Sequence, residues 1–166
     1  MATTVTTTYL ELTDPAELKP PRQAPPPGFA TRIVHDPRIN ADMYRRVGAE
    51  YAWVDRLRWT EAQWARWAAS LETHVAELDG EVCGYFELAL ESPRSAKIPI
   101  FGLLPEFHGR GLGGHMLTAA LARGLSLRPR VWLTTCTLDG PHALANYRAR
   151  GMRPFRVETF DTVIAS

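Results

Sequence analysis

The sequence predicts an α+β fold, with a central mixed sheet that is mostly antiparallel and has helices on both faces. Three observations predict it. The turn Asp79-Gly80 joins two strand-like segments, which indicates an antiparallel hairpin. Residues 81–90 are largely apolar in both alternating sets, which is typical of a strand covered on both faces. Finally, a glycine-rich stretch at 109–114 separates a strand-like run from a helix and another strand, which indicates one crossover.

The bulk composition narrows the possible partners. The chain has 166 residues, 45% of them hydrophobic and 22% charged, which fits one globular domain with a real core. A formal net charge of +1 gives no reason to expect nucleic acid or an anionic membrane as partner. Cys83 and Cys136 form no disulfide framework, and no His/Cys/Asp cluster has metal-ligand spacing. With no signal peptide and no run long enough to span a bilayer, we expect a cytoplasmic protein without a metal.

The N-terminal residues 1–28 are expected to form a strand followed by a strap. The segment from Thr3 to Leu12 is dense in β-branched residues and is predicted to be a strand. The prolines between Pro20 and Pro27 predict a stiff extended connector that Gly28 ends. Residues 29–166 are then the main part of what we expect to be a single domain overall.

The next segments predict a short strand and two helices. Phe29–Val34 is the strand, and Asp36-Pro37 opens a helix from about Ile39 to Trp53 with apolar residues spaced by four. Thr60 is a predicted N-cap for a helix from Glu61 to Leu71. The connector Tyr51–Trp59 mixes aromatic residues with charges of both signs.

The rest of the chain completes the order ββααβββαβαβ. After the hairpin come a strand, the glycine-rich turn and a helix that ends near Gly124. The predicted elements are the strands Thr73–Leu78, Glu81–Leu90, Lys97–Leu104, Arg130–Thr135 and Phe155–Ile164, and the short helix His142–Arg150.

The glycine-rich stretch predicts a site for a phosphate-bearing ligand. Glycines after a strand and before a helix expose backbone N–H groups at the positive end of the helix dipole. No Lys-Ser or Lys-Thr follows them, which excludes a P-loop. Gly109, Gly111 and Gly114 match GxGxxG literally. A dinucleotide fold is disfavoured because antiparallel strands come first and no carboxylate follows the next strand until Asp139.

Two further motifs carry a family resemblance. Leu103-Leu104-Pro105-Glu106-Phe107-His108-Gly109-Arg110-Gly111-Leu112-Gly113 resembles motif A of the GNAT acyltransferases, Q/R-x-x-G-x-G/A after a strand. Ala143-Leu144-Ala145-Asn146-Tyr147-Arg148-Ala149-Arg150-Gly151-Met152 is similar to motif B, A-x-x-x-Y-x-x-x-G-F. The two motifs stand in the order and at the separation of that family, and the resemblance extends from about Phe29 onward.

The resemblance implies the acyl-CoA N-acyltransferase fold and acetyl-CoA as the acyl donor, with no metal. His108 departs from the usual Gln or Arg, and Gly140 stands where motif B often has Asn. Carried over residue by residue, the resemblance implies a set of coenzyme-binding residues: Leu103, Leu104, His108, Gly109, Arg110, Gly111, Leu112, Gly113, Gly114, Asn146, Tyr147 and Arg150.

Two residues are the candidates for catalysis. By the resemblance, the phenol of Tyr147 protonates or hydrogen-bonds the thiolate that leaves when an amine attacks the thioester. Glu87 is the candidate base, because it is the lone carboxylate in an otherwise apolar strand where burial would raise its pKa. His108, His142 and Asp139 are the weaker alternatives.

The acceptor pocket is expected opposite the coenzyme and is partly built from the connector Tyr51–Trp59. In that connector, Trp53, Asp55 and Trp59 could enclose an amine. The predicted function is therefore an acetyl-CoA-dependent N-acetyltransferase that acts on the primary amine of a small molecule. Acetylation of a protein N-terminus or lysine remains an alternative, as does a non-catalytic acyl-CoA sensor on the same fold. The chain is expected to be a monomer or a homodimer.

Overall fold

In the computed structural model, residues 2–163 are described, and they form one seven-stranded sheet with four α-helices. The strand order is β2-β3-β4-β5-β6-β1-β7. The elements are β1 (Ala2–Leu12), β2 (Phe29–Val34), α1 (Pro37–Gly48), α2 (Glu61–Ala69), β3 (Glu72–Leu78), β4 (Glu81–Leu90), β5 (Ser95–Leu103), α3 (Leu112–Leu127), β6 (Arg130–Cys136), α4 (Ala143–Ala149) and β7 (Arg153–Val163), with 3₁₀ turns at Pro15–Glu17 and Pro105–Phe107.

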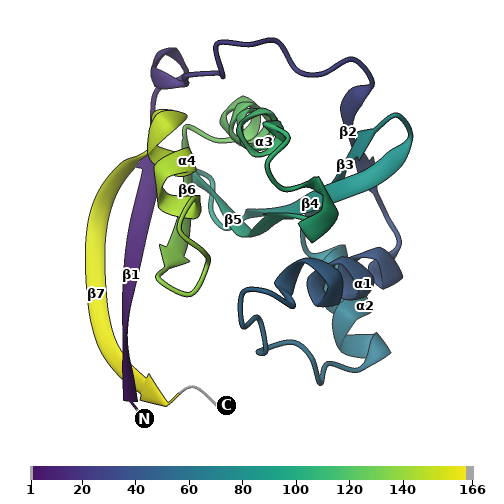
Figure 1. Cartoon of the computed structure of the whole chain (residues 1–166), viewed down its shortest axis with the longest axis vertical. Helices are drawn as coiled ribbons and strands as arrows, with labels where there is room; N and C mark the ends of the chain where they lie inside the picture. Colours follow the sequence, from purple (N-terminus) through teal and green to yellow (C-terminus); the bar gives the residue numbers. More distant parts are fainter. Residues whose placement is uncertain (1, 164–166) are drawn as a thin grey trace.

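The predicted α+β architecture is confirmed. Every strand pair is antiparallel except β5 and β6, which are parallel and joined by α3 as the single crossover. Helices α3 and α4 lie on one side of the sheet, and α1 and α2 lie on the other (Figure 1). Strand β4 is buried on both faces for this reason: Phe86 and Leu88 join the main core, and all of residues 83–88 are buried.

Strand β1 is an internal strand of the sheet rather than an appendage to it. It pairs with β6 from Thr7 to Leu12 and with β7 from Ala2 to Glu11. Leu10 and Leu12 are fully buried in the core beneath the sheet. The density of β-branched residues predicts that this segment is a strand, but it carries no information about which strands are its neighbours.

Helix α1 is shorter than predicted, because it ends at Gly48 and not near Trp53. The Trp53 side chain folds back onto the helix end, where a Cβ on Gly48 would lie only 2.6 Å from Trp53 Cβ. Ala52 takes a positive φ of 57°, which a continuing helix does not allow. The apolar residues spaced by four therefore continue beyond the end of the helix. The last of them belong to a connector that packs back on the helix. Helix α2 begins as predicted, with Thr60 and Gln63 forming a capping box.

The strap crosses the side of the sheet that carries α3 (Figure 1). The backbone N–H of Lys19 donates to the carbonyl of Arg150 at 2.9 Å. A Cβ on Gly114, in the first turn of α3, would lie 3.0 Å from Pro21 Cγ. The strap therefore packs against the end of α4 and the start of α3. The predicted last residue of the final strand, Ile164, lies outside the described residues. None of the described helices is long and apolar enough to cross a membrane.

One ion pair makes stability depend on acidic pH. Hydrogen bonds from Arg123, at 2.6 and 3.0 Å, and from His74 lower the pKa of Glu72 to about 2. Because the folded-state pKa lies below the unfolded value, the stabilisation is complete above about pH 4.5 and is lost as the pH falls toward 2. We expect Glu72→Gln to lower the free energy of unfolding by about 1–2 kcal/mol at pH 7, allowing for partial exposure of the pair. Urea titrations at pH 7 and pH 3 should show this difference shrinking at the lower pH.

Candidate active site

The candidate site begins where β5 and β6 part. These two strands pair only between residues 95–97 and 130–132. Among the described strands, none pairs with that edge of β5 beyond Lys97, so the backbone groups of residues 98–103 are available there. An extended ligand arm can use such an edge as an added strand does, through main-chain hydrogen bonds.

A bulge in β5 lies at the same place. Glu87 of β4 pairs with Ile100 of β5, and Ala89 pairs with Lys97. A step of two residues in β4 therefore faces a step of three in β5, so β5 has one extra residue there. A bulge bends its strand and increases the local twist. It therefore turns β5 away from β6 at the point where pairing between them stops.

The glycine-rich loop has the geometry expected of an anion cradle. Gly109 and Gly111 have φ values of 76° and 74°, and a Cβ on either would meet nothing within 4 Å. Gly111 is the N-cap of α3, and no side chain caps the helix there. Because no side chain caps them, the first N–H groups of α3 can bind a ligand. They lie at the positive end of the helix dipole.

Helix α4 brings two predicted coenzyme residues to this helix start. A Cβ on Gly113 would lie 3.6 Å from Asn146 Nδ2, and one on Gly114 would lie 2.7 Å from Arg150 Nη1. The Nε of Arg150 is buried and has no hydrogen-bond partner among the described residues. A buried guanidinium N–H without a partner, beside a helix N-terminus, fits the phosphate oxygens of a ligand such as coenzyme A.

Tyr147 lies on α4, and its ring packs on β5 in the part of that strand that does not pair with β6. Its buried ring packs edge-on against Phe101 of β5, with the ring centroids 6.0 Å apart. Burial raises the pKa of the Tyr147 phenol well above its usual 10, and the negative charge of the Asp139 carboxylate raises it further, as does the Tyr51 phenol once it is ionised. The phenol is therefore protonated throughout the neutral range and can act as a hydrogen-bond donor.

Sequence reasoning missed Tyr51. Its hydroxyl lies 3.2 Å from His108 Nε2, and His108 Nδ1 lies 3.9 Å from a carboxylate oxygen of Glu50. A Cβ on Gly140 would lie 3.1 Å from Tyr51 Cε1. The two positions that depart from the family motifs, His108 and Gly140, thus both contact the Tyr51 ring. The signal in the sequence was this pair of departures, but only the structure shows that they meet.

Asp139 lies in the loop between β6 and α4. One of its carboxylate oxygens accepts hydrogen bonds from Thr135 Oγ1 at 2.8 Å and from the backbone N–H of Cys136 at 2.9 Å. Its charge contributes to the raised pKa of both Tyr147 and Tyr51. A carboxylate is therefore fixed near both phenols.

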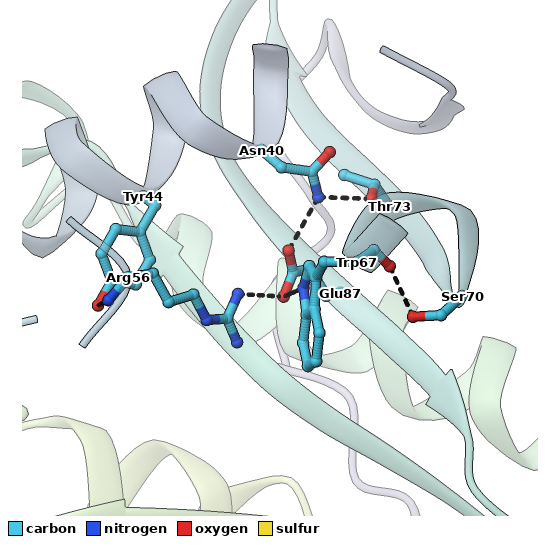
Figure 2. A network of polar contacts seen from close by, with 7 residues as sticks. All are labelled: Asn40, Tyr44, Arg56, Trp67, Ser70, Thr73 and Glu87. Atoms are coloured by element: carbon cyan, nitrogen blue, oxygen red, sulfur yellow. Dashed lines mark hydrogen bonds and ion pairs between the residues drawn. The ribbon is translucent and has the colours of Figure 1, made fainter. Parts of the chain in front are cut away.

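Glu87 lies on the α1 and α2 side of the sheet, in a buried polar network (Figure 2). It is fully buried, and its carboxylate accepts hydrogen bonds from three side chains: Arg56 at 3.0 Å, Trp67 at 3.0 Å and Asn40 at 2.8 Å. Asn40 also donates to Thr73 at 2.8 Å. A base needs a lone pair that faces the proton it takes, and both oxygens of Glu87 instead face donors of this buried network, one of them the Arg56 guanidinium. This geometry favours a structural role, and catalysis by Glu87 stays a prediction.

The structure separates the three predicted acceptor residues. Trp53 reaches β5, where a Cβ on Gly102 would lie 3.4 Å from Trp53 Cη2. Asp55 is exposed. Trp59 packs instead against Trp64, at 4.8 Å between ring centroids, and lines a shallow surface hollow of about 330 Å³ along α2. Of the three, Trp53 is brought to the parted strands, and acceptor binding by the others stays a prediction.

The described residues contain no group of three or more His, Cys, Asp or Glu side chains arranged to hold a metal ion. The polar groups near the parted strands are instead backbone amides, two phenols, a guanidinium, an imidazole and the Asp139 carboxylate, and of these the amides and the guanidinium suit an anionic organic ligand.

Comparisons with known proteins agree with this geometry. The model of the acetyltransferase (GNAT) family matches residues 39–152. A GCN5-related N-acetyltransferase from Kribbella flavida is similar in structure, with 19% identity and a TM-score of 0.65 over 96% of this chain and 58% of its own. A GCN5-related N-acetyltransferase from Sphaerobacter thermophilus has 17% identity and a TM-score of 0.66 over 95% of this chain and 51% of its own.

A shorter relative is covered more completely. An IAA acetyltransferase from Bacillus cereus has 21% identity and a TM-score of 0.57 over 77% of this chain and 79% of its own. The chain otherwise spans about six-tenths of the length of the first solved structures that it matches. No curated protein gave a significant match. The structural similarity shows the fold, and the family model matches more than half of the sequence, so the chain belongs to the GNAT family of acetyltransferases.

Proposed function

We propose that this protein transfers an acetyl group from acetyl-CoA to the primary amine of a small molecule. The observation that supports it most is that three features of the candidate site lie close together. The unpaired edge of β5, the open glycine loop at the start of α3 and the buried phenol of Tyr147 all border the gap between β5 and β6. Residues 98–103 would hold the pantetheine arm, and the loop with Arg150 would hold the pyrophosphate.

In the proposed reaction, the neutral amine attacks the thioester carbonyl directly. The new C–N bond forms, the C–S bond breaks, and the electron pair leaves on sulfur. The raised pKa of Tyr147 makes complete proton transfer to a thiolate unfavourable, since thiols ordinarily have pKa values near 8.5. The phenol would therefore stabilise the departing thiolate mainly as a hydrogen-bond donor.

The proton that the amine loses is proposed to leave through Tyr51 and His108. The Tyr51 hydroxyl contacts His108 Nε2, and imidazole is the side chain that changes charge near neutral pH. Once protonated, Nε2 could donate to the carbonyl of Leu103, which lies 3.2 Å away, while Nδ1 faces Glu50. The resulting imidazolium would thus have an acceptor or a negative charge at each nitrogen.

A small acceptor is favoured over a peptide. Tyr51 spans from the connector to the loop at Gly140, which narrows the approach on that side. Asp139 supplies a negative charge for an ammonium group, and Trp53 supplies an aromatic wall. The net charge of +1 also offers no acidic groove for a strongly basic peptide.

Thiol release from acetyl-CoA over a panel of small amines, peptides and buffer alone tests the proposal. We expect release with one class of small primary amine and none with N-terminal or lysine peptides. Release with peptides alone would favour the protein acetyltransferase, and coenzyme binding without release from any acceptor would favour the sensor.

The variant Gly113→Glu tests the placement of the coenzyme. A Cβ at this position meets only Asn146 and Leu103, at 3.6 and 3.8 Å, so a small side chain fits. A glutamate would extend into the anion cradle, and we expect it to weaken coenzyme A binding at least about a hundredfold through bulk and like charge. Calorimetric titration should give Gly113→Ala an affinity for coenzyme A close to that of the wild type. The neutral variant Gly113→Gln should have an affinity between those of Gly113→Ala and Gly113→Glu. Undiminished binding by folded Gly113→Glu would refute the placement.

A further inference from the structure

The outer edge of β7 has no partner strand among the described residues, although Pro154 and a bulge at Phe155 interrupt it near its start. This strand is the last in the sheet, and no strand among residues 2–163 pairs with its outer side. Four of its large apolar side chains are 44–75% exposed: Phe155, Val157, Phe160 and Val163. Natural proteins usually shorten or cover such edges, because an exposed edge is a template for pairing with another chain.

The far half of the β1–β7 ribbon also lacks a third strand. Strand β6 pairs with β1 only from Thr7 onward, while β7 continues beside β1 to Ala2. The ribbon projects beyond the rest of the sheet (Figure 1). Two-stranded ribbons are marginally stable in water, whereas three or more strands with an apolar face are not. A further strand beside β7 would therefore stabilise this half of the ribbon.

We propose that this strand belongs to a second copy of the chain, with the two β7 strands antiparallel across a two-fold axis at Val157. Such an axis stands perpendicular to the joined sheet and keeps each face on its own side. Residues directly opposite each other must share a face, so odd residues meet odd ones and even residues meet even ones along the regular stretch 156–163, beyond the bulge at Phe155. The axis must therefore pass through a residue position rather than between two positions.

Charge decides among the remaining registers. An axis at Val157 places Arg156 opposite Glu158 of the second copy, twice, and places Val157 opposite itself. An axis at Arg156 or at Glu158 would oppose two like charges, which is destabilising across strands. An axis at Thr159 or Phe160 leaves these charges facing uncharged residues. Only the axis at Val157, among positions 156–160, matches both charge pairs.

The two charged side chains are already arranged for this contact. Within one chain Arg156 and Glu158 form an ion pair on the same face, and Tyr9 donates a hydrogen bond to Glu158 at 3.0 Å. Their side chains are nevertheless 61% and 40% exposed. Pairing of two copies would bring four charges of alternating sign together on one face, with the two Val157 side chains in contact on the other.

Sedimentation equilibrium with charge-reversal variants tests the proposal. We expect the wild type to dimerise, and Glu158→Arg or Arg156→Glu alone to raise the dimer dissociation constant about tenfold or more, because like charges then oppose each other. The double variant Arg156→Glu/Glu158→Arg should recover most of the affinity. Glu81→Arg, the same reversal at an exposed residue of β4, is the matched control and should not change it.

A cross-link gives an independent readout. With the axis at Val157, the Cβ atoms of the two copies lie about 4.5–5.5 Å apart, so Val157→Cys should form an intermolecular disulfide under mild oxidation with little backbone adjustment. Val163→Cys should not exceed the wild-type background, because its two copies would lie twelve residues apart along the ribbon. A wild type that stays monomeric at all concentrations overturns the proposal. A dimer dissociation constant that neither single charge reversal changes would overturn it as well. So would equal cross-linking of the cysteine variants at positions 157 and 163.

Discussion

Replacing Arg56 by Met is expected to cost this protein about 3–5 kcal/mol of unfolding free energy, because it leaves a buried carboxylate without its counter-ion. Arg56 is only 12% exposed, and its partner Glu87 is not exposed at all. The guanidinium also lies over three aromatic rings: Tyr44, Trp59 and Trp67, at 5.5, 5.0 and 4.3 Å from the ring centroids. Methionine preserves much of the side-chain volume but provides neither the charge nor the hydrogen bond.

The double variant Arg56→Met/Glu87→Gln is the matched control. With both charges removed, we expect its loss in urea unfolding to fall short of the sum of the two single losses by about 1–3 kcal/mol. Additive losses would show that the pair does not act as a unit. The Glu87→Gln variant also tests the predicted base. A structural Glu87 leaves the acidic limb of the pH–rate profile unchanged, whereas a shifted limb with an intact fold would favour catalysis by Glu87.

The largest effect on activity is expected for Tyr147→Phe. Because it removes the hydrogen bond to the departing thiolate, we expect kcat to fall about a hundredfold or more while the KM for acetyl-CoA changes little. The ring and its edge-on packing against Phe101 are kept, so stability should hold. Steady-state thiol release gives both constants. A kcat within threefold of the wild type would remove Tyr147 from the chemistry.

Tyr51→Phe is the contrasting variant, because it removes the phenol on the proton-accepting side. Its effect should be greatest on the acidic limb of the profile, where the amine arrives protonated and must lose its proton before it attacks. Tyr147→Phe should instead lower the plateau at every pH, since burial raises the pKa of that phenol and keeps it protonated. If the two variants gave profiles of the same shape, the assignment of separate roles would fail.

Much of the fold follows from local patterns in the sequence. The hairpin at Asp79-Gly80, the strand apolar on both sides and the crossover through the glycine loop are each set by residues close together in the chain. These features predicted the mixed sheet with helices on both faces. They also predict an anion cradle at the start of α3, because a glycine-lined helix start has the same electrostatics wherever it occurs.

The parts that the sequence did not reveal depend on contacts between distant segments. The burial of Glu87 was predictable from its strand, but its counter-ion comes from the connector, at Arg56, whose position follows from packing on α2. The contact between Tyr51 and His108 likewise joins residues 57 positions apart. The place of β1 between β6 and β7 is a third case, since a strand-forming pattern does not select its neighbours.

A crystal structure of the protein with acetyl-CoA would show whether the coenzyme occupies the proposed site. We expect the pantetheine arm along residues 98–103 of β5, and the pyrophosphate at residues 109–114 with Arg150 Nε donating to it. We also expect the sulfur atom within about 3.5 Å of the Tyr147 hydroxyl. A coenzyme bound away from the gap between β5 and β6, or a sulfur atom that Tyr147 cannot reach, would contradict this placement.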